Sequence, residues 1–101
     1  MPAILYLPGA LDDLKRLRDF LADSDRVAAG ETVALILDAV DVLAAHPLIG
    51  RAAYDGSREL VISRGRTGYV ALYRYDEGTD RVLVAAVRHQ RVAGYDPQGG
   101  R

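Results

Sequence analysis

The residues best suited to chemistry follow a strongly apolar stretch: Arg88-His89-Gln90-Arg91, with Tyr95 shortly after. Arginine can hold a phosphate through paired hydrogen bonds, histidine can transfer a proton near neutral pH, and tyrosine can stack on a base. If Arg58, Arg64 or Arg66 approaches from neighbouring strands, the second half of the chain presents a basic cleft. The pattern alone fits equally well with a solvated strand end held by ordinary ion pairs.

Other chemistries lack the residues they need. Cysteine is absent, and neither His46 nor His89 has a partner at metal-ligand spacing, so we expect no metal and no cofactor. The segment Gly65-Arg66-Thr67-Gly68 lacks the length and the lysine of a phosphate-binding loop, and no serine lies in a nucleophile elbow. We interpret the paired carboxylates of residues 12–13 and 23–25 as charges at helix ends rather than as acid–base catalysts.

The net charge of −1 argues against a surface that binds nucleic acid everywhere. Its distribution is uneven, because residues 1–50 carry four basic and eight acidic residues, a net −4, whereas residues 51–101 carry nine and six, a net +3. Twelve of the thirteen basic residues are arginine, which suits bidentate contacts. A high genomic GC content, which favours arginine codons, is the alternative explanation of this bias. The second half therefore holds the candidate site.

Length and hydropathy limit the organisation of the chain. Its 101 residues suit one domain, which we expect over residues 1–96 with a flexible tail over residues 97–101. No apolar run approaches the roughly 18 residues of a membrane span, and the N-terminus lacks a signal-peptide pattern. We therefore expect a cytoplasmic protein that makes no contact with a membrane.

The spacing of apolar residues predicts the elements that position these side chains. We expect a strand at 3–7, a helix at 11–21, a helix from about 26 to 45, and strands at 58–63, 69–75 and 81–89. The order β-α-α-β-β-β predicts an α+β domain in which a helical hairpin covers one face of a small antiparallel sheet.

Three local expectations can be compared with the structure. Asp12 and Asp13 should occupy the first turn of the first helix, where its dipole favours negative charge. The second helix is apolar nearly all round and should be buried on more than one side, with a narrow polar strip facing water. That strip consists of Glu31, Thr32, Asp38 and Asp41.

The order of elements and several short sequence segments together resemble the RelE/ParE superfamily of bacterial type II toxins. The resemblance covers residues 3–96, and the segments that carry it are Leu14–Leu21, Leu43–Arg51, Arg58–Ile62, Gly68–Arg74 and Val87–Arg91. It implies a toxin neutralised by a co-expressed antitoxin in a hetero-oligomer. It also implies one of two activities: RelE-like members cut mRNA on the ribosome, and ParE-like members inhibit DNA gyrase without cutting nucleic acid.

The residues in these segments favour the ParE-like activity. RelE-like nucleases usually carry an arginine directly after the Gly-Tyr-like pair that opens the penultimate strand, and this sequence has Val70 there. Many of them are also rich in lysine, whereas Lys15 is the only lysine in this chain. We therefore expect a toxin that binds gyrase and is not an enzyme.

The site residues depend on which activity applies. For gyrase binding, the expected contacts are Arg88, His89, Arg91 and Tyr95. For the alternative, a ribosome-dependent endoribonuclease, Arg58 and Arg91 would stabilise the phosphate, His89 would transfer the proton and Tyr95 would stack or assist. A third alternative is an interaction module that has lost toxicity.

Two surfaces suit the antitoxin. It could add a strand to an open sheet edge or lay a helix against the apolar helical hairpin. Packing of the second helix into the core explains its apolar character without a partner.

Overall fold

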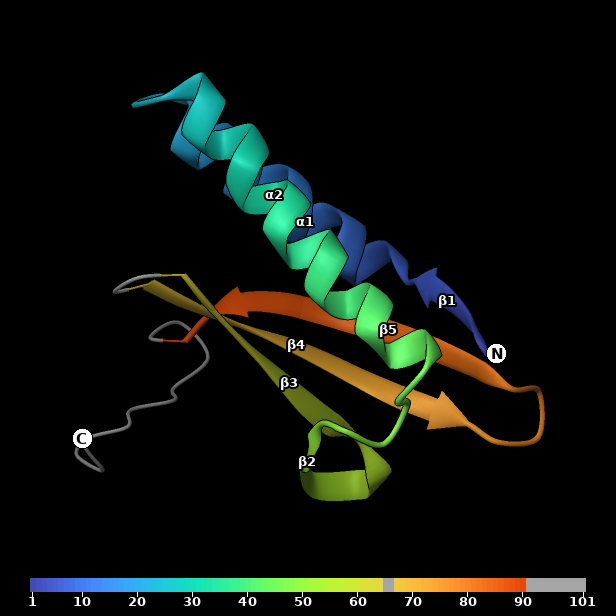
Figure 1. The fold of residues 1–101 in the computed structure, drawn as a ribbon. Coiled ribbons are helices and arrows are strands. Elements are labelled where there is room, and N and C mark those ends of the chain that lie inside the picture. Colours follow the sequence, from blue (N-terminus) through green and yellow to red (C-terminus); the bar gives the residue numbers. More distant parts are fainter. Residues whose placement is uncertain (65–66, 91–101) are drawn as a thin grey trace.

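The computed structural model describes residues 1–64 and 67–90, and Figure 1 shows how its elements are arranged. Along the chain these are β1 (Ala3–Tyr6), α1 (Pro8–Ala22), α2 (Arg26–Asp41), the 3-10 helix η1 (Val42–Ala44), β2 (Arg51–Ala52), the 3-10 turn η2 (Tyr54–Gly56), β3 (Arg58–Arg64), β4 (Thr67–Asp76) and β5 (Arg81–His89). The predicted order is confirmed, and the two-residue β2 is added to it. The expected tail over residues 97–101 lies outside the described residues.

The five strands form one sheet in the order β1-β5-β4-β3-β2. Strands β3 to β5 pair antiparallel as expected, and the additional strand β2 pairs antiparallel with β3. Strand β1 instead lies parallel to β5, from Ala3 opposite Arg81 to Tyr6 opposite Val84. The sheet is therefore mixed. A short hairpin turn forces its two strands to run in opposite directions, whereas the two helices that follow β1 impose no such restriction.

The helices α1 and α2 run side by side over one face of the sheet, and the turn that joins them lies away from the strands (Figure 1). Helix α1 begins at Pro8, three residues earlier than predicted, because proline suits the first helical position, where no backbone N–H is needed. Asp12 and Asp13 consequently lie in the second turn, so the prediction that they occupy the first turn is wrong.

The core lies between this helical layer and the sheet. Its largest fully buried side chains belong to Ile36, Leu43, Val40, Tyr73, Val82 and Val84. On α2, the buried positions Ala29, Thr32, Ile36 and Val40 recur every three or four residues and form one face. Thr32 is 6% exposed, so its predicted place on the water-facing strip is wrong. Its helical phase with Ile36 turns it inward.

Strand β5 contains a bulge that changes which groups face the core. Val84 lies opposite Tyr73 and Ala86 lies opposite Leu72, so Ala85 has no opposite residue on β4. One extra residue shifts the alternation of a strand by one position. Val84 and Val87 therefore both belong to the core cluster although they are three residues apart.

Candidate functional site

Arg88 and His89 lie at the end of β5, as the sequence predicts. His89 is half-buried opposite Tyr69 of β4, and the two rings meet edge to face with centroids 5.5 Å apart. Arg88 is exposed, opposite the buried Val70. This end of the sheet carries a cationic side chain beside an aromatic pair.

A groove of about 770 Å³ lies beside these two residues, between α1 and the end of β5. Its apolar lining consists of Leu17, Phe20, Leu21, Tyr69 and Val87. Its polar lining consists of Asp13, Arg16, Arg88 and His89. We call it the α1/β5 groove. Its chemistry suits a partner that has apolar side chains and negative charge.

Asp13 links α1 to β5 within this groove. Its Oδ2 accepts a hydrogen bond from the backbone N–H of Val87 at 2.9 Å. The bond needs both the early start of α1, which sets the position of Asp13 along the helix, and the bulge at Ala85, which turns the Val87 N–H toward α1. The spacing of apolar residues does not predict this role, because neither the start of α1 nor the bulge shows in that spacing.

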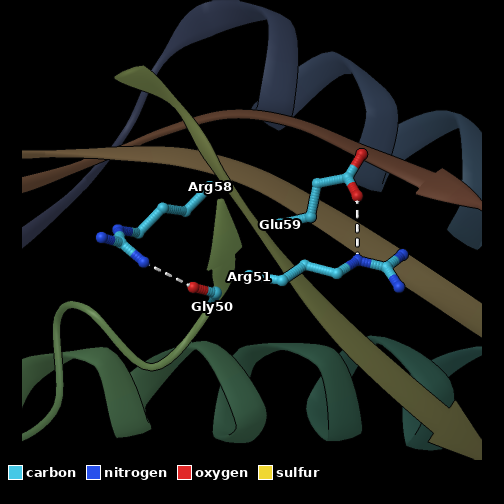
Figure 2. Close-up of polar contacts among 4 residues, drawn as sticks. All are labelled: Gly50, Arg51, Arg58 and Glu59. Carbon is cyan, nitrogen blue, oxygen red and sulfur yellow. Dashed lines mark hydrogen bonds and ion pairs between the residues drawn. The ribbon is translucent and has the colours of Figure 1, made fainter. Parts of the chain in front are cut away.

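Arg58 lies far from His89. It pairs with Tyr73 of β4, four residues from the Tyr69 that pairs with His89, a separation of about 13 Å along the strand. Figure 2 shows its guanidinium directed toward the loop before β2, where Nη1 donates to the carbonyl oxygens of Gly50 at 2.8 Å and Leu48 at 3.2 Å. The structure therefore does not bring Arg58 and His89 together.

The same loop is fixed by Tyr73, whose side chain is 1% exposed. The Tyr73 hydroxyl donates to the carbonyl of Pro47 at 2.8 Å and accepts from the N–H of Gly50 at 2.9 Å. Burial raises the pKa of this phenol, while the Gly50 N–H and the charge of Arg58 oppose the increase. Arg58 and Tyr73 together hold the loop in place.

The adjacent strand pairing carries an ion pair on the surface. Arg51 Nε lies 3.1 Å from Glu59 Oε1, as Figure 2 shows. The two residues are opposite each other in β2 and β3, so this contact supports the short edge strand.

The remaining candidate residues are placed only in part. Arg66, Arg91 and Tyr95 lie outside the described residues, and Arg64 pairs through its backbone with Thr67. Among residues 1–64 and 67–90, no group of three or more histidine or acidic side chains is arranged to hold a metal ion. No helix in this part of the chain is long and apolar enough to cross a membrane.

Comparison with known proteins identifies the family. Residues 4–93 match the family described as ParE toxin of type II toxin-antitoxin system, parDE. Toxin RelE3 of Caulobacter vibrioides is 39% identical over 89 residues, which make up 88% of this chain and 95% of that protein.

Two solved structures share the fold. A chain of the chromosomal ParDE toxin–antitoxin system from P. aeruginosa has a TM-score of 0.75 at 20% identity, over 88% of this chain and 96% of that one. A chain of the RelBE2 toxin–antitoxin complex from Mycobacterium tuberculosis has a TM-score of 0.64 at 24% identity, over 88% and 99%. With the family match over nearly its whole length, the chain belongs to the ParE toxins of type II toxin–antitoxin systems, within the RelE/ParE superfamily.

Proposed function

We propose that this toxin acts in the cytoplasm, inhibits DNA gyrase by binding it without catalysing a reaction, and is neutralised by a cognate antitoxin in a hetero-oligomer. The observation that carries the proposal is Val70. At the position where the nuclease members of the superfamily usually carry an arginine, this chain has an aliphatic side chain that is 4% exposed. A buried valine cannot stabilise the charge that develops on a phosphate during cleavage.

The position of Arg58 also supports binding over cleavage. Its guanidinium donates to two loop carbonyls at the other end of the sheet from His89. A general base and a phosphate-stabilising group must lie within hydrogen-bond reach of one substrate. With its guanidinium bonded to these carbonyls and its backbone about 13 Å along the strand from that of His89, Arg58 is not directed toward a phosphate that His89 could reach.

We propose Arg88 and His89 as contacts to gyrase, with Arg91 and Tyr95 from the following segment. Arg88 is exposed at the end of β5, and a guanidinium can form bidentate contacts with acidic side chains of a protein target. The test is a supercoiling assay with purified gyrase and increasing toxin.

The expected result is inhibition by the wild type and at least tenfold weaker inhibition by Arg88→Ala. Arg81→Ala is the matched control, because Arg81 is an exposed arginine at the opposite end of the same strand. Full gyrase activity in excess wild-type toxin would refute the proposed target. Equal inhibition by both variants would refute the proposed contact.

The second candidate is a ribosome-dependent endoribonuclease, because the relative that shares 39% identity is named toxin RelE3. Mapping of 5′ ends in cells that express the toxin distinguishes the two activities. New ends in the register of the ribosomal A site support the nuclease, and their absence together with gyrase inhibition supports our proposal. Unimpaired growth on induction without antitoxin would favour a non-toxic interaction module.

A further inference from the structure

The helices cover one face of the sheet (Figure 1), and the opposite face carries apolar side chains. Tyr73 of β4 is buried in the core on the helical side, so its neighbours Leu72 and Arg74 face the other way. Leu83 of β5 lies opposite Arg74 and shares its face. Leu72 and Leu83, together with Leu7, line a hollow of about 270 Å³. A sheet face that meets only water is typically polar, so these leucines indicate contact area for a partner.

Tyr54 lies beside this hollow, at the start of the turn η2. Its side chain is 81% exposed, and it also lines a second hollow, of about 200 Å³, that extends to Arg88. Leu72 is the other residue common to both hollows, so the two are continuous. Tyrosine supplies a large, rigid contact area at a low cost in side-chain entropy, and it is enriched among the residues that dominate binding energy.

The backbone of η2 is held in a fixed shape after Tyr54. The carbonyl of Tyr54 accepts from the Ser57 hydroxyl at 2.7 Å and from the Ser57 N–H at 3.2 Å. Asp55 and Gly56 follow in the left-handed region, with φ of 60° and 76°. The Arg74 guanidinium lies against Gly56, where an added methyl group would be 2.6 Å from Nη1. An ordered turn presents Tyr54 with little further loss of backbone entropy on binding, which favours affinity.

Two exposed arginines lie on this face, Arg74 at the first hollow and Arg88 at the second. Arg88 lies opposite Val70, four residues along β4 from Arg74, which separates the two backbone positions by about 13 Å. Arg74 Nη2 lies 3.7 Å from Asp55 Oδ2, an exposed contact that leaves the guanidinium other donors. An aromatic ring with an arginine at each adjoining hollow favours an acidic partner over a second copy of this chain, which would present the same arginines.

We propose that Tyr54 is the anchor residue of the gyrase contact: its ring enters an apolar pocket of gyrase, and Arg74 and Arg88 bind acidic side chains beside that pocket. The inference rests on the proposed gyrase target and adds the face of the toxin that gyrase contacts and the residue that dominates the contact. The surface extends from Arg88 at the end of β5 to η2. Asp55 limits the affinity, because it partly neutralises Arg74 and repels an acidic partner.

The first test measures the toxin concentration that half-inhibits supercoiling by purified gyrase. We expect Tyr54→Ala to raise it at least tenfold, the effect of truncating an anchor residue, and Tyr54→Phe, which keeps the ring, to raise it by less than about threefold. Val27→Ala is the matched control, because Val27 is 70% exposed at the start of α2, on the helical side. Its value should equal that of the wild type.

The outcomes of this test separate the surface from the target. Tyr54 is exposed, so the melting temperature of Tyr54→Ala should match that of the wild type, and a lost fold does not explain lost inhibition. Inhibition by Tyr54→Ala equal to that by Val27→Ala would overturn the proposed surface and leave the gyrase target intact. A wild type that leaves gyrase fully active would refute the target, and this surface with it.

The second test addresses the charge of the partner. Asp55→Asn removes the carboxylate beside Arg74, and asparagine tolerates the left-handed backbone of this position. We expect this variant to half-inhibit gyrase at about 1.5- to 5-fold lower concentration, the range of one exposed ion pair, with a gain that shrinks as salt is added. Asp12→Asn, on the exposed side of α1, makes the same change in net charge and should have no effect. Weaker or unchanged inhibition by Asp55→Asn would overturn the acidic partner.

Two other occupants of this surface give different results. If gel filtration shows a wild-type dimer that Tyr54→Ala converts to monomer, the surface joins two copies of this chain. If toxin expression creates new 5′ ends that Tyr54→Ala abolishes, the surface takes RNA. Either result would overturn the proposal.

Discussion

The Tyr73 hydroxyl allows a sharp test of how the loop before β2 is held. The phenol is buried in the core of the sheet, and its oxygen both donates to Pro47 and accepts from Gly50. Tyr73→Phe removes that oxygen and leaves the ring in place. The same change at Tyr6 is the matched control, because the Tyr6 hydroxyl is buried without a hydrogen-bond partner in the described part of the chain.

The two substitutions should change stability in opposite directions. The two hydrogen bonds of Tyr73 contribute about 1 kcal/mol each, and the N–H of the buried Gly50, left without an acceptor, adds about 1 kcal/mol of desolvation. We expect Tyr73→Phe to lower the free energy of unfolding by about 3 kcal/mol. Tyr6→Phe removes an unsatisfied buried oxygen and should raise the same free energy by about 1 kcal/mol.

Urea unfolding followed by circular dichroism measures both changes, with midpoints compared at an unchanged slope. A loss below about 1 kcal/mol for Tyr73→Phe would show that water replaces the hydroxyl and that the loop does not depend on it. Destabilisation by Tyr6→Phe would show that its hydroxyl has a partner in solution. Either result would refute the reasoning from burial and hydrogen bonding.

Three further predictions concern pH, a helix cap and two glycines. Burial, with a smaller contribution from a nearby carboxylate, raises the pKa of Tyr6 from 10.0 to about 12. The neutral phenol of Tyr6 therefore contributes its full stabilisation below pH 10, and this contribution is lost as the pH rises through 12. Between pH 10 and 12, the free energy of unfolding measured with urea should fall more in the wild type than in Tyr6→Phe. Equal decreases in the two proteins would contradict this prediction. The Asp25 side chain accepts from two backbone N–H groups at 3.0 and 3.1 Å, so Asp25→Ala should lower the free energy of unfolding in urea by about 1 kcal/mol, and no change would exclude the cap. Gly50→Ala puts a methyl group 2.6 Å from the Tyr73 ring and should lower the melting temperature. The methyl group of Gly30→Ala in α2 meets nothing within 4 Å, and this substitution should raise the free energy of unfolding by about 0.5–1 kcal/mol. An unchanged melting temperature for Gly50→Ala would contradict the close packing.

Local pattern was enough to predict most of the fold. The alternating residues of β3 and β4 and the apolar run of β5 led to the strands that the structure contains, because the period of two is a property of the strand itself. The leucines from Leu14 to Leu21 predicted α1 for the same kind of reason. The first residue of a helix and the face that the helix buries were predicted less reliably, as the start of α1 at Pro8 and the buried Thr32 of α2 show. Competing apolar positions leave open which face of a helix turns toward the core.

The candidate site was predictable only as a segment. Arg88 and His89 lie at the end of β5, as their place after an apolar run indicated. The grouping of Arg58 with them was a hypothesis about the distance between strands, and the register places Arg58 opposite Tyr73, four residues along β4 from the partner of His89. Register depends on which residues face each other across the sheet, which no single strand encodes.

The sequence by itself determined the element order, the family resemblance and the concentration of arginine in the second half of the chain. Only the tertiary structure decided that β1 runs parallel to β5, that the bulge at Ala85 turns the Val87 N–H outward, and that Asp13 reaches it from α1. The physical reason is the range of the interactions. Periodicity and turn chemistry act over a few residues, whereas the Asp13–Val87 bond joins residues 74 positions apart and forms only after helix and sheet have packed.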